Sequence, residues 1–154
     1  MIDFSLANIG LLDNRFLAKS IGLLKPHNPI TVEENSSIEH AIQLLQQNKV
    51  GCVIVTDRPG KIVGIVTERD VVIKVALAKI DLSRTQVTTI MTKAPHTEFM
   101  TTSMAHAVSL MSRGGFRHLP IVDEENYPIG IISVKDLIDF IVGETLRELE
   151  KIGT

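Results

Sequence analysis

Hydrophobic positions recur along the chain in two patterns that predict helices and short strands. Residues 38–45 and 104–111 carry apolar side chains at the i, i+3, i+4 spacing of an amphipathic helix. Two further helices are predicted from Glu68 to about Ile80 and from Val134 to about Lys151. Apolar runs rich in β-branched residues predict strands buried on both faces, at 52–55, 62–66, 118–122 and 129–132.

Turn-forming residues group these strands into two hairpins. Asp57–Gly60 separates the first pair of strands and Asp123–Asn126 separates the second. A short extended segment precedes each first helix, at Pro29–Val32 and at Pro95–Glu98. Each half of the chain is therefore predicted to be β-α-β-β-α, a mixed α/β (α+β) arrangement. Because about 60 residues bury little surface, we expect the halves to pack together as one domain.

The two halves are also an internal repeat. Displacing the sequence by 66 residues places 37–72 on 103–138 without a gap, and eight of the 36 positions are identical. The identical pairs include an aspartate near the end of each segment, Asp70 and Asp136. The apolar positions between the identities follow the same pattern in both halves, which indicates one structural unit used twice.

Composition excludes several classes of protein. A length of 154 residues suits one domain, and 44% hydrophobic with 22% charged residues excludes a disordered or collagen-like chain. A net charge of −2 argues against binding to nucleic acid or to an anionic membrane. The chain has one cysteine, Cys52, no apolar run of 18 residues and no signal-peptide pattern. We therefore expect a soluble cytoplasmic protein.

Catalytic and metal-binding chemistry finds little support in the sequence. The five histidines lack ligand spacing such as H-x-x-x-H, so we expect no metal site. No GxSxG, P-loop or GxGxxG motif is present. We expect no enzyme activity and no required cofactor.

The most informative motif is a hydroxyl residue followed three positions later by an aspartate. Thr67 and Ser133 fall at the predicted starts of helices, with Asp70 and Asp136 three positions on. A capping box accounts for this pattern, and Ser36–Glu39 predicts a third. The same arrangement also suits a nucleotide, because helix N–H groups bind phosphate and a carboxylate accepts hydrogen bonds from ribose hydroxyls. The two roles are compatible.

These segments resemble the tandem cystathionine-β-synthase (CBS) motifs of a Bateman module over about residues 20–145. The matching stretches are GIVTERD (64–70), GIISVKD (130–136), FRHLPIVDEE (116–125) and TVEENSSIEHAIQLL (31–45). The resemblance implies two βαββα motifs packed with pseudo-two-fold symmetry. It divides the chain into an N-terminal, helical extension (1–19), motif 1 (20–82), motif 2 (83–145) and the end of a C-terminal helix (146–154).

The resemblance implies two nucleotide pockets built across the motifs. One would take Ser133 and Asp136, with Ile30 and Val50 flanking the base; the other would take Thr67, Asp70, His96 and Phe116. Arg117 and His118 stand where phosphate-contacting basic residues occur in the family. Considered singly, Ile30, Val50 and Phe116 are better explained as core, and Arg117 and His118 are equally well explained as a solvated edge. Gly51, the repeat mate of Arg117, cannot grip phosphate, so we expect the Ser133/Asp136 pocket to bind a phosphorylated ligand more tightly.

The sequence thus predicts a regulatory sensor of AMP, ADP or ATP that acts on an unknown protein. One alternative is a structural or protein-interaction module without a ligand, and another is a regulator that binds S-adenosyl compounds or dinucleotides. An apolar stripe at Leu146, Leu149 and Ile152 predicts a homodimer.

Overall fold

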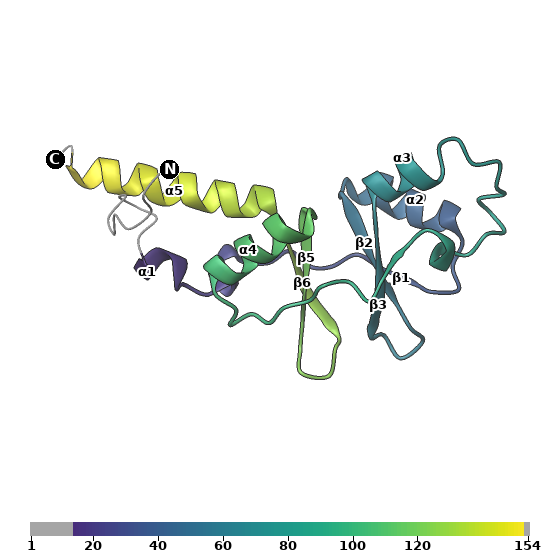
Figure 1. Ribbon diagram of the computed structural model, residues 1–154, viewed down its shortest axis with the longest axis horizontal. Coiled ribbons are helices and arrows are strands. Elements are labelled where there is room, and N and C mark those ends of the chain that lie inside the picture. Colours follow the sequence, from purple (N-terminus) through teal and green to yellow (C-terminus); the bar gives the residue numbers. More distant parts are fainter. Residues whose placement is uncertain (1–13, 153–154) are drawn as a thin grey trace. The chain divides into compact units, whose positions relative to one another are not determined.

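The protein has a mixed α/β fold, seen in a computed structural model that describes residues 14–152 (Figure 1). The elements in chain order are α1 (Asn14–Leu17), η2 (Ile21–Leu24), β1 (Thr31–Glu33), α2 (Ile38–Asn48), β2 (Cys52–Thr56), β3 (Ile62–Thr67), α3 (Glu68–Lys74), η3 (Val87–Thr89), β4 (Thr92–Lys93), α4 (Met104–Gly114), β5 (His118–Val122), β6 (Pro128–Ser133) and α5 (Val134–Ile152). The predicted fold class is confirmed, as are the two hairpins.

The chain divides into two compact units. One contains the residues up to His27, Glu98–Leu119 and the chain from Ile132 onward; the other contains Asn28–Thr97 and Pro120–Ile131. The units do not coincide with the two halves of the repeat. The tip of the second hairpin lies in the unit of the first half, and the segment that ends at His27 lies in the unit of α4 and α5.

The unit of the first half is built on a four-stranded sheet with the order β1-β2-β3-β4. β1 runs parallel to β2, whereas β3 is antiparallel to both β2 and β4. Every residue of β2 is buried, and Figure 1 shows α2 and α3 beside this sheet. A Cβ on Gly64 would lie 3.2 Å from the backbone oxygen of Thr92, so the close approach of β4 to β3 requires glycine there.

The other unit gathers α1, η2, α4 and α5. Ile21, Met104 and Leu119 are almost fully buried in it, and the rings of Phe16 and Phe140 lie 5.9 Å apart between centroids. α1 is the described part of the predicted helical extension, because residues 1–13 lie outside the described residues. None of the helices within residues 14–152 is long and apolar enough to cross a membrane.

Two predicted elements differ from the structure. Pro95–Glu98 forms no strand: the short β4 precedes it and ends at Lys93, and the left-handed φ of 43° at Ala94 breaks the extended backbone just before Pro95. The second half therefore has only a two-stranded sheet, β5-β6.

The second helix of the first half is also shorter than predicted. It ends at Lys74 rather than near Ile80, and the N–H groups of Val75 and Ala76 both donate to the carbonyl of Val71. A run of β-branched residues there lowers helix propensity. α5, by contrast, extends over the range predicted for it.

Candidate functional site

The first candidate carboxylate, Asp70, completes a capping box at the start of α3. The N–H and hydroxyl groups of Thr67 both donate to Oδ2 of Asp70, at 2.9 and 2.8 Å, and the Asp70 N–H donates back to the Thr67 hydroxyl at 3.2 Å. The predicted cap is confirmed. Because Oδ2 receives both Thr67 protons, Oδ1 is the oxygen of Asp70 that faces other partners.

That second oxygen is held by a lysine of the same helix. Lys74 Nζ lies 2.8 Å from Asp70 Oδ1, one helical turn further on, and also donates to the carbonyl of Ile90 at 2.6 Å. Asp70 itself is only 9% exposed. Its carboxylate is therefore neutralised within α3 by a cation that has an additional anchor.

The second candidate carboxylate, Asp136, repeats the cap at the start of α5. The N–H and hydroxyl groups of Ser133 donate to Asp136 Oδ2 at 2.6 and 2.8 Å, and the Asp136 N–H donates to the Ser133 hydroxyl at 3.2 Å. Phe140 occupies the position that corresponds to Lys74, so α5 supplies no equivalent lysine. The partner of Oδ1 is instead Nε2 of His27, at 3.0 Å.

The electrostatic environment keeps Asp136 ionised at neutral pH. Partial burial alone raises the pKa of this carboxyl, but the hydrogen bonds from the Ser133 hydroxyl and N–H, and from His27, outweigh it, and the pKa lies below its ordinary value. An ionised carboxylate accepts hydrogen bonds only, which is the property needed to bind the hydroxyls of a ribose.

The remaining predicted site residues lie in varied surroundings. Ile30 and Val50 are half-buried and pack against the core beside the four-stranded sheet, as expected of core residues. Arg117 is exposed, and its carbonyl accepts the N–H of Val134 at 3.0 Å, which places it next to the start of α5. His118 begins β5 and is half-buried.

Two predicted wall residues occupy loops. His96 is exposed in the loop after β4, and Phe116 is half-buried just after α4. α4 ends at Gly114 and is capped by Gly115, which has a left-handed φ of 66°. A Cβ at Gly114 would collide with the ring of Phe116, so glycine is needed there for the ring to lie where it does.

The third predicted capping box is wrong by one residue. The N-cap of α2 is Ser37, whose hydroxyl accepts the N–H of His40 at 3.1 Å, and Ser36 does not fill that role. Its repeat mate Ser103 caps α4 in the same way through His106. The identity of these two serines in the repeat was the signal that marks the cap correctly.

Neither a cluster of metal-ligating side chains nor a reactive thiol is found within residues 14–152. No group of three or more histidine, cysteine, aspartate or glutamate side chains gathers there in a way that could hold a metal ion. Burial, with a smaller contribution from the charge of Glu68, raises the pKa of Cys52 to about 12, so this thiol is protonated and unreactive.

Comparison with known proteins agrees with this arrangement. The family model of the CBS domain matches twice, over residues 23–76 and 87–143. An uncharacterized 17.7 kDa protein of Acidianus ambivalens is 31% identical over 121 residues, which cover 79% of this chain and 72% of that protein. CBS domain-containing proteins of Arabidopsis thaliana match at 27% identity over 96% of this chain, which spans only 27% of their length.

Solved structures include relatives with bound adenosine compounds. A CBS domain protein of Pyrobaculum aerophilum, solved in complex with AMP, has a TM-score of 0.70 and 28% identity, covering 77% of this chain and 89% of that one. The CBS domain pair of protein MJ0100, in complex with methylthioadenosine and S-adenosyl-L-methionine, has a TM-score of 0.71 and 25% identity. It covers 79% of this chain and 98% of that one.

Proposed function

Because this chain belongs to the CBS domain family, we propose that it binds an adenosine nucleotide such as AMP, ADP or ATP and acts as a non-enzymatic regulatory module. The observation that carries the proposal is the repeated carboxylate. Asp70 and Asp136 each follow a Gly-x-x-Thr/Ser strand end, and each uses one oxygen for the helix cap while the other faces outward from it.

The geometry suits a ribose and a phosphate together. Oδ1 of Asp136 accepts a hydrogen bond from a ribose hydroxyl, as a carboxylate oxygen outside a cap can. Arg117 is exposed and its backbone lies beside the start of α5, and its guanidinium binds the phosphate bidentately. The residues predicted to flank the base, Ile30, Val50, His96 and Phe116, remain part of this proposal. His118 contributes a second phosphate contact at the Asp136 site.

Isothermal titration calorimetry with AMP and 2′-deoxy-AMP tests the proposal. Loss of the 2′-hydroxyl weakens binding to the wild-type chain if a carboxylate accepts from it. Asp136→Asn keeps an oxygen for the Ser133 cap but replaces the other oxygen by an amide N–H₂ donor. It therefore removes the preference for AMP over 2′-deoxy-AMP without removing the cap. Arg117→Gly, which introduces the residue found at position 51, weakens the binding of AMP but not that of adenosine. Equal affinity of every variant for AMP contradicts the proposal.

S-adenosyl compounds are a second candidate ligand, favoured by the methylthioadenosine and S-adenosyl-L-methionine bound to the CBS domain pair of protein MJ0100. They share the adenosine moiety but lack phosphate. Titrating S-adenosylmethionine beside AMP, ADP and ATP separates the two classes, because Arg117→Gly weakens only the phosphorylated ligands. If no adenosine compound binds, the protein-interaction module without a ligand becomes the better account.

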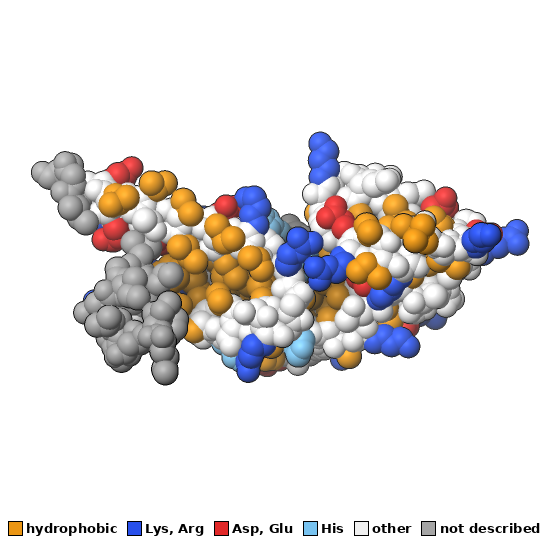
Figure 2. Space-filling view, turned by 45° about the horizontal axis from the view of Figure 1, so that its top comes forward, with side chains coloured by type: hydrophobic (Ala, Val, Ile, Leu, Met, Phe, Trp, Pro, Cys, Tyr) orange, Lys and Arg blue, Asp and Glu red, His pale blue; other side chains and the backbone are white. Residues whose placement is uncertain are grey.

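We also propose that the regulatory module is a homodimer. α5 exposes apolar side chains at a helical spacing, and Figure 2 shows hydrophobic side chains gathered along it. The exposed members are Ile138, Val142, Leu146 and Leu149, each at least half uncovered. The side chain of Ile152, the third predicted member, lies outside the described residues.

A stable dimer would bury more than about 1,200 Å² in total. Light scattering at micromolar concentration tests it: Leu146→Glu with Leu149→Glu should give a monomer, and a monomeric wild type contradicts it.

A further inference from the structure

His27 reaches Asp136 from a segment that the local backbone directs toward it. η2 ends at Leu24 and is capped by Lys25, which adopts a left-handed conformation with φ of 51° and donates its N–H to the carbonyl of Gly22 at 3.1 Å. Pro26 follows, and its ring restricts φ to about −65°. The chain therefore turns sharply and then has little rotational freedom immediately before His27.

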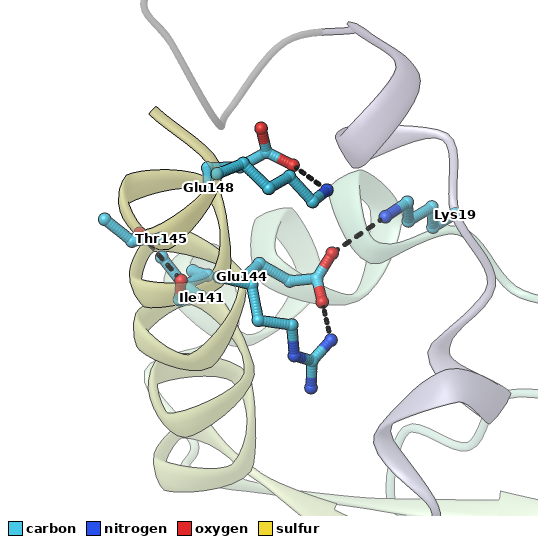
Figure 3. Close-up of polar contacts among 7 residues, drawn as sticks. Lys19, Ile141, Glu144, Thr145 and Glu148 are labelled. Atoms are coloured by element: carbon cyan, nitrogen blue, oxygen red, sulfur yellow. Dashed lines mark hydrogen bonds and ion pairs between the residues drawn. The ribbon is translucent and has the colours of Figure 1, made fainter. Parts of the chain in front are cut away.

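Contacts upstream hold the same segment in its unit. Lys19 Nζ lies 3.2 Å from Glu144 of α5, a carboxylate that also pairs with Arg147 (Figure 3). The hydrogen bond from Lys19 and the charges of the neighbouring cations lower the pKa of Glu144 against a smaller opposing effect of burial, so the pair is charged at neutral pH. The N–H of Ile21 donates to the carbonyl of Thr102 at 2.8 Å. His27 is thus positioned on Asp136 by a segment anchored on both α5 and the start of α4.

The contact occupies the oxygen that a ligand would need. Oδ2 of Asp136 already accepts two protons from Ser133, and His27 lies on the remaining oxygen, Oδ1. A ribose hydroxyl that binds Asp136 must therefore replace the imidazole. The His27 side chain is 70% exposed, whereas that of Asp136 is 19% exposed, so the imidazole can move into water while the carboxylate stays in place.

We propose that His27 is a built-in competitor for Asp136 that sets the affinity of this site for nucleotide. The inference rests on the proposed function. A site that is competent only when His27 has moved away binds with an apparent dissociation constant raised by the reciprocal of the open fraction. Contacts between an exposed side chain and a carboxylate are weak, so removal of His27 should tighten AMP binding by about twofold to fivefold.

Calorimetry on the full chain with AMP tests this with three variants. His27→Ala removes the competitor and should bind AMP about twofold to fivefold more tightly than wild type. His27→Lys places a cation beside the carboxylate, which occupies the same oxygen, and should bind AMP no more tightly than wild type. His40→Ala is the matched control, since it removes an exposed histidine from α2 without touching Asp136, and its affinity should be unchanged.

The outcomes separate this inference from the function on which it rests. If His27→Ala binds AMP with unchanged or lower affinity, His27 is not a competitor, although the protein still binds nucleotide. If His27→Lys binds as tightly as His27→Ala, the gain does not come from freeing the carboxylate, and the inference is again wrong. If neither wild type nor His27→Ala binds any adenosine compound, the proposed function fails and the competitor role fails with it.

Discussion

The carboxylates of Asp70 and Asp136 are capped alike, but their outer oxygens have different partners. In both, one oxygen accepts from the N–H and hydroxyl of a Thr or Ser at the start of a helix. Lys74, on the same helix as Asp70, holds the other oxygen in the first copy, whereas His27, 109 residues away in the chain, holds it in the second. The repeat thus duplicates the capping box but not the residue that contacts the outer oxygen of the aspartate. Access of a ligand to the outer oxygen, Oδ1, therefore depends on which residue contacts it.

The largest difference between the copies should appear in stability. Lys74→Met leaves the nearly buried Asp70 carboxylate without its cation, and we expect a loss of about 1–3 kcal/mol in the free energy of unfolding. His27→Ala removes an exposed partner from Asp136 and should cost less than about 1 kcal/mol. Urea denaturation of both variants beside wild type measures the difference. Equal losses would mean that the two carboxylates depend on these partners to the same extent.

The N-cap hydroxyls of α3 and α5 should differ by a smaller amount in their contribution to the free energy of unfolding. Loss of an N-cap hydroxyl costs about 0.5–2 kcal/mol. α3 has 7 residues and α5 has 19, so α3 has fewer other interactions to keep its first turn in place. We expect Thr67→Ala to fall near the upper end of this range and Ser133→Ala near the lower end, measured by thermal unfolding. A larger loss for Ser133→Ala would show that helix length does not decide the effect.

Sequence reasoning identified both capping boxes because each depends on residues three positions apart. The partner of Asp70 was within reach of the same reasoning, since Lys74 lies four positions further along the helix, where opposite charges meet. His27 was not, because nothing local connects it to Asp136. Its contact depends on the left-handed turn at Lys25 and on the docking of the whole segment.

One of the elements that differ from prediction has a cause of the same kind. Pro95–Glu98 was predicted as a strand because Pro29–Val32 occupies the corresponding place, yet the preceding left-handed Ala94 ends the pairing with β3. Symmetry of the repeat predicts the elements whose own residues specify them. It is less informative for connecting segments, where single backbone turns decide the path.

The smallest expected effect is the pH dependence of stability that arises from Asp136, in the second half of the repeat. The pKa of Asp136 in the folded chain lies below the ordinary value of 3.8. A depressed pKa contributes stability above that value, and the contribution is lost as pH falls through the folded pKa. The stability advantage of wild type over Asp136→Asn should therefore shrink as pH falls from about 5 to below 3.8. Chemical denaturation over this range measures it, and an advantage that does not change with pH contradicts the assignment.

The most direct test of the inequivalence is AMP calorimetry on Asp70→Asn and Asp136→Asn beside wild type, after circular dichroism has shown that both variants fold. A hydrogen bond to a charged group contributes about 1.5–3 kcal/mol, or about 10- to 150-fold in affinity. The account predicts that Asp136→Asn weakens the tighter binding event by a factor in this range, while Asp70→Asn leaves that event intact. Loss of the tighter event in Asp70→Asn, with Asp136→Asn unaffected, would contradict it.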